Sequence, residues 1–377
     1  MSASSVIVIG AGLAGAAAAW QLARRGHDVV VLERTEPANH WGSSHGSARI
    51  FRYAYPDALY TRLVVEARRG WDELEREGAM PLISAVGAVD HGDRRDPVRL
   101  ARVLADQGVA HELLSAAEAT DRWGGIAFDG AVLWHDEAGV IDAEGAVNTM
   151  LRLAVAAGAT VRTGWPVAAV SPRGAGYMAV SSTGDVVEAE QVVVAAGGWL
   201  PDLLGGLGIG AERLAAFPSL EVRQEQAFHF PYRDSADVWP TIIHKSAPIQ
   251  VYALPGGRDA EFRGQKVAEY NGGHAIRSAA WHDRAIDPVR RERVVAYVRE
   301  NLPGLVPEPY AETTCLFTNT AGEDFVIDRI DGITILSPCS GHGAKFAPLL
   351  GEYVARLVEG DGDVPDRFRP LTAGVRA

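Results

Sequence analysis

The sequence predicts an α/β fold whose first unit is a strand, a glycine-rich turn, a helix and a second strand. An apolar run at residues 6–9 leads into Gly10, Gly12 and Gly15, and a second apolar run covers 29–32. In such a unit the first glycine allows the tight turn, the second lets the backbone approach a ligand, and the third brings the helix close to the sheet. The free N–H groups in the first turn of the helix then face phosphates. We therefore predict a dinucleotide-binding βαβ unit.

An acidic residue, Glu33, stands at the end of the second apolar run. A carboxylate in this position accepts hydrogen bonds from the ribose of an adenosine and repels the 2′-phosphate of NADP. The alternative interpretation is a glycine-rich turn in an unrelated α/β domain. The agreement between the strand, the helix expected over 16–25, Gly26 and the terminal acid favours dinucleotide binding.

Length and composition limit the class of protein. The chain of 377 residues suits two domains, and its 47% hydrophobic and 22% charged residues are typical of a soluble globular protein. The net charge of −12 argues against a nucleic acid or an anionic membrane as a partner. No window approaches about 18 uninterrupted apolar residues, so no membrane span is expected. The apolar start is interpreted as a strand rather than a signal peptide.

The two cysteines, Cys315 and Cys339, predict that the protein has no disulfide framework and suit a cytoplasmic location. The spacing of histidine, cysteine and acidic residues matches no metal-binding motif, so no metal is expected. The expected partners are small molecules, and the expected assembly is a monomer or a small homo-oligomer.

Hydrophobic periodicity predicts the later elements. The pattern at 115–118 is a capping box that opens a short helix. A continuous apolar run at 192–196 is typical of a buried parallel strand, so we expect it to rejoin the N-terminal sheet. Alternation over 222–230 and 249–254 predicts strands in a sheet with unlike faces. Longer helices are expected over 57–78, 97–107, 142–157, 288–301 and 348–358.

These elements divide into two domains. We predict a Rossmann-like nucleotide domain assembled from residues 1–80, 141–214 and 321–377. A second domain, α+β with a mixed sheet, is inserted twice and takes residues 81–140 and 215–320. The fold class is therefore α/β with an inserted α+β domain.

Three further segments resemble motifs of the flavoprotein amine and amino-acid oxidases, in particular the family of monomeric sarcosine oxidase and N-methyltryptophan oxidase. They are GSSHGSARIFR at 42–52, TCLFT at 314–318 and SGHGAKF at 340–346. The resemblance extends over nearly the whole chain and is weakest over 87–131 and across the inserted sheet. It implies FAD in a glutathione-reductase-like domain beside a mixed-sheet substrate domain. It also implies oxidation of a secondary (N-methyl or cyclic) α-amino acid to its imine, with O2 reduced to H2O2.

The resemblance also implies how the cofactor is held. Cys315 occupies the position at which the family links a cysteine to the flavin as an 8α-S-cysteinyl thioether. Such a link withdraws electrons from the ring and prevents loss of the cofactor; the alternative is a small buried apolar residue. Cys339 has no such match and is interpreted as a packing residue. The other cofactor-binding residues that the βαβ motif and the resemblance imply are Gly10, Gly12, Gly15, Glu33, Arg34, Ser44, Val167, Gly197, Gly341, Gly343 and Lys345.

Arg52 and Lys345 occupy the positions that hold the substrate carboxylate in the similar enzymes. Two fixed cations suit one carboxylate, because arginine offers a bidentate fork and lysine a point charge. The alternative for Arg52 is a surface salt bridge. Arg49 and His45 match residues that lie against the flavin, and a purely structural role is the alternative for both.

Lys266 is a further candidate for catalysis. A period of two places it on one face of a strand with Ala268 and Tyr270. A lysine on an inner strand is costly unless it is partnered. In the family a lysine at this place faces the flavin edge and activates oxygen, because a fixed cation stabilises the charge of superoxide. The alternative is an exposed lysine on a sheet edge.

Aromatic residues bear on the substrate. Tyr252 aligns with an active-site tyrosine of the family. Tyr270 stands where the sarcosine oxidases have a histidine that contacts the substrate, which argues against sarcosine itself. Trp239, Trp281 and Tyr252 are candidates for a larger aromatic pocket, and a place in the core is the alternative for each.

Other classes of protein share parts of this pattern. A glycine motif followed by an acid also serves flavin hydroxylases and amino-acid dehydrogenases that pass electrons to another acceptor. The chain has no second GxGxxG for NAD(P)H, which argues against a reductase with two nucleotides. A binding protein with an inactive flavin fold is a third class, and the presence of Arg52, Lys345, Cys315 and Lys266 argues against it.

Overall fold

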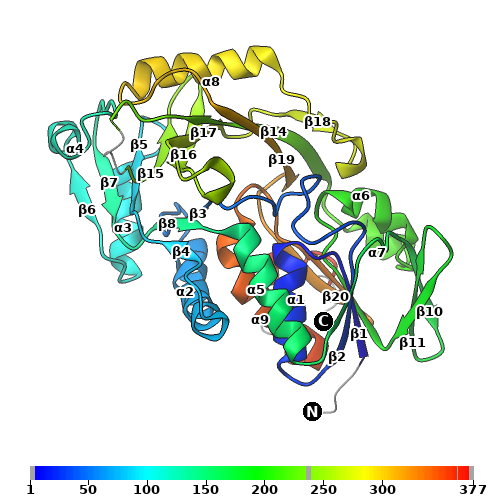
Figure 1. Ribbon diagram of the computed structural model, residues 1–377. Coiled ribbons are helices and arrows are strands. Elements are labelled where there is room, and N and C mark those ends of the chain that lie inside the picture. Colours follow the sequence, from blue (N-terminus) through cyan, green and yellow to red (C-terminus); the bar gives the residue numbers. More distant parts are fainter. Residues whose placement is uncertain (1–4, 235–238, 363, 373–377) are drawn as a thin grey trace.

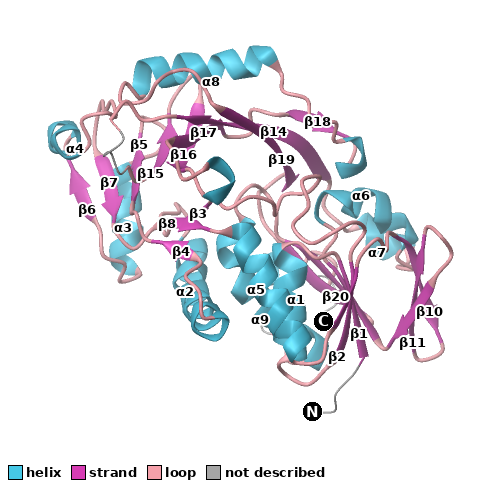
Figure 2. Ribbon diagram, viewed as in Figure 1, coloured by secondary structure: helices cyan, strands magenta, loops and turns pink. Residues whose placement is uncertain are grey.

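The computed structural model describes residues 5–234, 239–362 and 364–372. Two large sheets organise the molecule, one at the lower right of Figure 1 and the other along its top and left, and Figure 2 shows helices packed on both. This arrangement confirms the predicted α/β fold class.

The first sheet contains the predicted βαβ unit. Its strands are parallel, except that β20 runs antiparallel to β21. In register, Ile9 of β1 lies beside Val194 of β13 and Leu32 of β2. The expectation that the apolar run at 192–196 rejoins the N-terminal sheet is therefore confirmed. The strand order is β20 (Val326–Ile330), β21 (Ile333–Ser337), β13 (Gln191–Val194), β1 (Ser5–Ile9), β2 (Asp28–Leu32) and β9 (Thr160–Arg162).

Helices cover one face of this sheet and a small sheet lies on the other side (Figure 1). The helices are α1 (Leu13–Ala23), α5 (Ala143–Ala156) and α9 (Ala347–Glu359), and α1 contacts both of the others. Nearly every residue of α1 is buried, which explains why the helix is apolar on all sides. The small sheet consists of β10 (Val167–Arg173), β11 (Gly176–Ser181) and β12 (Val186–Ala189).

The second sheet is mixed and carries α8 (Pro288–Asn301) along its outer side (Figure 1). β15 runs parallel to β5, whereas its other neighbour, β16, is antiparallel. The strand order is β18 (His274–Ile276), β14 (Leu220–Phe230), β17 (Gln265–Glu269), β16 (Gln250–Pro255), β15 (Thr241–Lys245), β5 (Ala88–His91), β7 (Val132–His135) and β6 (Glu112–Leu114), with β19 (Ala311–Thr320) paired to β14.

The expectation of unlike faces is wrong for β14. Residues 224–230 are all buried, so both faces of this strand are covered. Its apolar residues Phe228 and Phe230 belong to a core that also contains Val294 and Val298 of α8. Some of its buried polar side chains have partners: Gln226 accepts a hydrogen bond of 2.8 Å from the N–H of Asp287, the N-cap of α8. Glu225 Oε1 and His229 Nδ1 are buried without a hydrogen-bond partner among the described residues.

The remaining elements follow the expected boundaries closely. The predicted capping box is present at α4, where Ser115 and Glu118 hydrogen-bond each other's backbone N–H groups. No helix in the described part of the chain is both long and apolar enough to cross a membrane. The other elements are α2 (Ala58–Gly78), α3 (Pro97–Asp106), α4 (Ala116–Arg122), α6 (Leu200–Leu203), α7 (Ala211–Ala215), β3 (Arg49–Phe51), β4 (Ile83–Ser84) and β8 (Gly139–Ile141).

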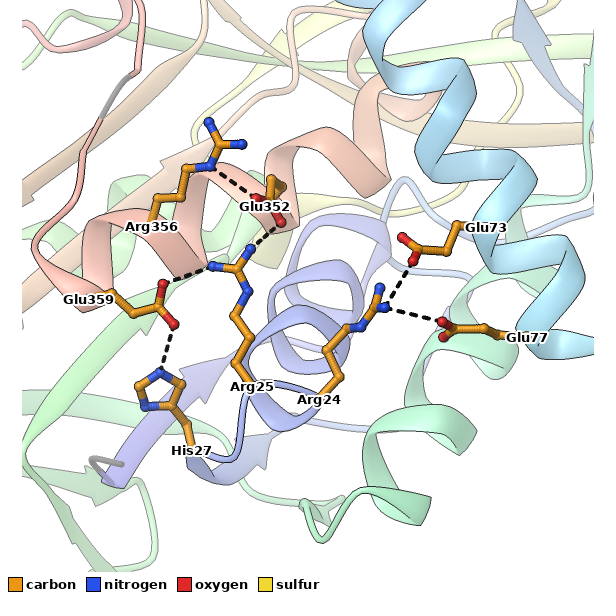
Figure 3. Close-up of polar contacts among 8 residues, drawn as sticks. All are labelled: Arg24, Arg25, His27, Glu73, Glu77, Glu352, Arg356 and Glu359. Atoms are coloured by element: carbon orange, nitrogen blue, oxygen red, sulfur yellow. Dashed lines mark hydrogen bonds and ion pairs between the residues drawn. The ribbon is translucent and has the colours of Figure 1, made fainter. Parts of the chain in front are cut away.

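An ion-pair network ties the end of α1 to α2 and α9 (Figure 3). Arg24 pairs with two glutamates of α2 at 2.9 and 3.2 Å, and Arg25 pairs with Glu352 and Glu359 of α9. Partly exposed pairs contribute at most about 1 kcal/mol each, so the network mainly fixes how the three helices are oriented. Its members are Arg24, Arg25, His27, Glu73, Glu77, Glu352, Arg356 and Glu359.

Gly351 allows α9 to pack closely on α1, because a Cβ at this position would lie 2.4 Å from the carbonyl oxygen of Ala17. We predict that Gly351→Ala lowers the free energy of unfolding by about 1–3 kcal/mol, since the added methyl group forces two helix backbones apart. Urea denaturation followed by circular dichroism measures the change.

Gly205→Ala is the matched control, because a Cβ there meets no atom within 4 Å. It adds the same methyl group in open space and should leave stability unchanged or slightly raised. Equal stability of the two variants would show that the contact between α1 and α9 does not require glycine.

Candidate active site

A large cavity of about 720 Å³ is lined by residues of both large sheets and of the loops that follow their strands. The residues that follow four neighbouring parallel strands line it: Gly10 after β1, Glu33 after β2, Gly197 after β13 and Cys339 after β21. The carboxyl edge of an open parallel sheet is where such folds bind ligands. The opposite wall comes from β16, β17 and β19 of the second sheet.

The three glycines of the first turn have different surroundings. Gly10 has a φ of +100°, and a Cβ there would lie 2.5 Å from the backbone oxygen of Ala195. Gly15 does not line the cavity; a Cβ there would lie 1.9 Å from the carbonyl oxygen of Gly10, so this glycine serves the contact between helix and turn. Gly12 lines the cavity beside Ser44. All three positions therefore exclude a side chain, two of them at the cavity wall.

Ser44 and Glu33 fix the backbone around this turn. The hydroxyl of Ser44 accepts a hydrogen bond of 3.0 Å from the N–H of Leu13, in the first turn of α1. The Glu33 carboxylate accepts bonds of 2.8 and 3.0 Å from the N–H groups of Ala11 and Thr35. The Thr35 hydroxyl and the Asn39 amide also donate to it, at 3.5 and 3.4 Å. A ribose hydroxyl would take the place of one of these longer side-chain bonds, because they are weaker than the two from the backbone. The predicted residues Arg34 and Val167 line the same end of the cavity.

Cys315, Lys266 and Tyr252 all line the cavity, and Cys315 lies close enough to interact electrostatically with both of the others. Cys315 is on β19 and Lys266 is on β17, which is an inner strand. Lys266 is only 5% exposed, so it is not the exposed edge lysine of the alternative interpretation. Burial, and then the charge of Arg49, lowers the pKa of Lys266 to about 8. Burial raises the pKa of the Cys315 thiol, although Arg49 and Lys266 act in the opposite direction.

Arg49 and His45 differ in position. Arg49 lines the cavity and donates hydrogen bonds of 2.8 to 2.9 Å to the carbonyl oxygens of Ser43, His45 and Ala48. It therefore also holds its own loop in place. His45 is buried behind the wall, does not line the cavity, and burial lowers its pKa to about 3.

Arg52 and Lys345 both line the cavity and both lie close to the ring of Tyr55. The guanidinium of Arg52 lies 4.5 Å from the centre of the Tyr55 ring, and Lys345 Nζ lies 5.7 Å from it. Arg52 donates to the carbonyl oxygen of Ala54, and Lys345 donates to that of His342 at 2.7 Å. Burial, followed by the charge of Arg52, lowers the pKa of Lys345 well below its ordinary value. An anion bound between these cations would relieve their repulsion.

The glycine turn that supplies Lys345 is also closely packed. Gly341 and Gly343 line the cavity, and a Cβ on Gly343 would lie 1.8 Å from the carbonyl oxygen of Pro338. The turn leads through a short 3-10 helix, η5 (Gly343–Phe346), into α9. Trp71 of α2 donates a hydrogen bond of 2.8 Å to the carbonyl oxygen of Lys345, which fixes this residue from behind.

The aromatic residues differ from expectation. Trp239 is buried in the core beneath α8, and Trp281 is 62% exposed, so neither of them lines the cavity. The larger rings on the wall include Tyr55, Phe317 and the predicted Tyr252 and Tyr270. Tryptophans far from glycine turns were poor candidates because a large ring more often completes a core.

Sequence reasoning also missed a buried ion pair at the wall. Arg95 lines the cavity and lies 2.6 Å from Asp90, and both side chains are almost inaccessible. Burial alone would raise the pKa of Asp90, but Arg95, with Arg52 and His135, holds it below its ordinary value. Arg95 also donates to the carbonyl oxygen of Ala54, next to the bond from Arg52. The pair falls in the region of weakest resemblance, where no local motif marks it.

Comparison with known proteins assigns the class. Residues 5–357 match the family described as FAD dependent oxidoreductase, and the chain belongs to this family. Peroxisomal sarcosine oxidase of Mus musculus is 30% identical over 93% of this chain and 91% of its own. N-methyl-L-tryptophan oxidase of Yersinia pestis is 28% identical over 94% of both chains. The structure of NikD, described as an unusual amino acid oxidase essential for nikkomycin biosynthesis, matches with a TM-score of 0.85, 25% identity and 98% coverage of both chains.

The residues present fit FAD. The first glycine turn with Glu33, the residues Cys315 and Lys266, and the second glycine turn all line this one cavity. The N-cap residue of α1, Gly12, has no side chain, and Ser44 takes only the N–H of Leu13, so the other N–H groups of the first turn suit the phosphates of a dinucleotide. The predicted family, FAD as cofactor and the oxidoreductase class are confirmed.

We predict that Asp90→Asn lowers the free energy of unfolding by about 3–5 kcal/mol, because it leaves the buried charge of Arg95 without its counter-ion. Chemical denaturation measures the loss. Glu112→Gln is the control: it breaks the exposed pair with Arg122, at 3.3 Å, and should cost less than about 1 kcal/mol. Similar small losses in both variants would contradict the assigned role of the buried pair.

Proposed function

We propose that this protein is an FAD-dependent oxidase that converts a secondary (N-methyl or cyclic) α-amino acid to its imine and reduces O2 to H2O2. The observation that carries the proposal is the placing of two cation sites in one cavity. Arg52 and Lys345 form one, and the buried Lys266 beside Cys315 forms the other. The names of the relatives, a sarcosine oxidase and an N-methyl-L-tryptophan oxidase, support this class of substrate.

Arg52 and Lys345 bind the substrate carboxylate in this proposal. The arginine supplies a planar fork and the lysine a point charge, and charge-assisted hydrogen bonds of this kind contribute about 1.5–3 kcal/mol each. The carboxylate held there fixes the position of the adjacent carbon and amine, because they are bonded to it. When bound, FAD takes up the two electrons released as C–N becomes C=N and passes them to O2.

Lys266 serves the oxygen half-reaction. Transfer of an electron to O2 creates a negative charge, and a fixed cation in a site with little water stabilises that charge strongly. Burial of Lys266 on an inner strand supplies such a cation without any movement of the chain. Tyr252 and Tyr270 line the same cavity and add apolar ring surface to its wall.

We also propose that Cys315 is bonded covalently to the flavin. Support comes from its position on the cavity wall, next to Lys266 and Arg49, rather than within a packed core. Cys339 also lines the cavity, but it lacks the match to the family motif that Cys315 has. Because neither cysteine forms a disulfide, we further infer a reducing, cytoplasmic location.

We propose the predicted division into two domains because it agrees with the membership of the two large sheets. Every strand of the first sheet falls within residues 1–80, 141–214 and 321–377. Every strand of the second sheet falls within residues 81–140 and 215–320. The first set is therefore proposed as the FAD-binding domain, and the second as the substrate domain.

We predict that the flavin stays with the polypeptide when the wild-type protein is precipitated with acid. Cys315→Ser should release the flavin under the same conditions, because a hydroxyl group does not form the thioether. Cys339→Ser is the control and should retain the colour. Complete loss of flavin from the wild type would contradict the covalent link, whereas FAD binding itself would stand.

We predict that Lys266→Met slows reoxidation of the reduced flavin by O2 by about 10²–10³, because the variant keeps the length of the side chain and removes its charge. Stopped-flow mixing of pre-reduced protein with O2 measures this rate, and anaerobic reduction by substrate should change far less. In the wild type, reoxidation should slow as the pH rises above about 8, where Lys266 loses its proton. The variant should lack this dependence.

The same experiment tests the proposed function. If secondary amino acids reduce the wild-type flavin but O2 does not reoxidise it, the protein is a dehydrogenase with another electron acceptor. If both half-reactions of Lys266→Met fall equally, Lys266 has a structural or substrate-binding role. If no secondary amino acid reduces the flavin, the proposed substrate class is wrong.

A further inference from the structure

The distribution of lysine in this chain is unusual. The sequence has three lysines among its 36 basic residues, and all three line the cavity. Lys266 and Lys345 have roles in the proposed function. The third, Lys245, has none.

Lys245 ends β15, at the wall that also contains Tyr270. Its Nζ lies 4.9 Å from the centre of the Tyr270 ring, and the side chain is partly buried. Across the strand pair its register partner is Gln250, another residue of the cavity wall. The ammonium group therefore faces the ligand space rather than the outer surface of the sheet.

The charges around Lys245 do not neutralise it. Arg95 and Arg52 repel it, and Glu323 and Asp90 attract it. Asp90 is already paired with Arg95 at 2.6 Å, and Glu323 accepts a hydrogen bond of 2.8 Å from the Tyr270 hydroxyl. Within residues 5–234, 239–362 and 364–372, no ion pair or hydrogen bond joins Lys245 Nζ to another group.

Burying the ammonium group of Lys245 without a counter-ion destabilises the fold, and a role in packing alone does not explain why the residue is a lysine. Burial, and then the charges of Arg95 and Arg52, lowers the pKa of Lys245 to about 8, so the folded chain holds this ammonium against desolvation and repulsion. The contact with the Tyr270 ring orients the ammonium but supplies no counter-charge. A neutral residue of similar length would pack against the ring without this cost. An anionic ligand would remove it.

We propose that Lys245 binds a second carboxylate of the substrate, so that the substrate class is a secondary amino acid with two acidic groups. One carboxylate lies between Arg52 and Lys345 beside Tyr55, and the other meets Lys245 beside Tyr270. The inference rests on the proposed function for the first carboxylate. It makes Lys245 a residue that determines specificity.

Binding without turnover gives the first test. Holoenzyme is titrated with glutarate and with its monoamide, and the change in flavin absorbance reports the affinity. The wild type should bind the diacid about ten- to a hundredfold more tightly, as expected for one charge-assisted bond. Lys245→Met should abolish that ratio, and Lys245→Arg should retain most of it. Equal ratios in wild type and Lys245→Met, or equal weakening of both ligands, would overturn the proposal.

Turnover gives the second test and locates the acidic group. N-methylaspartate and N-methylglutamate carry it on the side chain, whereas iminodiacetate carries it on the nitrogen substituent. Each is compared with its monoamide by kcat/KM in the wild type and in Lys245→Met. The proposal is supported if the wild type prefers the diacid and this preference falls about ten- to a hundredfold in the variant. Whether the side-chain diacids or iminodiacetate show the preference tells which part of the substrate carries the second carboxylate. A wild type that prefers the amides overturns it.

Failure of the proposed function has a different signature. In that case none of these amines reduces the flavin in the absence of oxygen. The titration with glutarate still measures whether Lys245 binds a carboxylate. A different result would overturn only the second carboxylate site and leave the proposed function standing. In that result, neutral and acidic secondary amino acids both reduce the flavin, and Lys245→Met does not change the ratio of their rates.

Discussion

Positive charge that is costly to bury is concentrated in a large cavity in the described part of the chain. Burial lowers the pKa of Lys245, Lys266 and Lys345 alike, and Arg52 or Arg49 adds repulsion in each case. Ordinary packing would replace such groups with apolar residues, since an unpaired buried charge destabilises a fold. The folded chain tolerates them because the two sheets and their helices supply stability elsewhere. What the cavity gains is a strong field for anions, including those that form only during a reaction.

Backbone carbonyl groups, rather than carboxylates, hold two of the cavity's cations in place. Lys345 and Arg52 donate to carbonyl oxygens of nearby residues, and Trp71 of α2 fixes Lys345 through its own carbonyl group. A carbonyl oxygen orients a cation yet carries no full charge, so the cation remains available to a ligand. The exception is Arg95, whose charge Asp90 neutralises. Arg95 and Arg52 donate to the same carbonyl oxygen, that of Ala54, so Arg95 helps to hold the wall beside Arg52.

Local signals in the sequence were sufficient for much of this structure. The turn at Gly10 and Gly15, the buried strand β13 and the capping box at α4 each depend on neighbouring residues, so their patterns could be recognised directly. The resemblance of three segments to the oxidase family implied site roles for Arg52, Cys315 and Lys345, and all three line one cavity. Their roles in chemistry remain predictions.

Features that depend on packing between distant segments escaped prediction. α8 and the loop before it cover one face of β14, and other segments, such as the turn at Gly273 that donates to Glu225, cover the opposite face, which no pattern within the strand reveals. Asp90 and Arg95 are only five positions apart, but the sequence does not reveal that the turn after β5 brings them together or that the second sheet buries both. Lys245 is an ordinary strand-end lysine in sequence, and only the approach of β15 to the cavity distinguishes it.

The scarcity of lysine has a practical consequence for chemical labelling. Reagents that acylate or alkylate primary amines find ε-amino groups only on the wall of the ligand cavity, because the arginines that supply the rest of the basic charge do not react with them. Lowered proton affinity makes those amines more nucleophilic near neutral pH. Coupling to dyes or resins through lysine would therefore compete with ligand binding, whereas a bound ligand would shield the same groups. Attachment at an engineered surface cysteine avoids this conflict only if Cys315 and Cys339 stay out of reach.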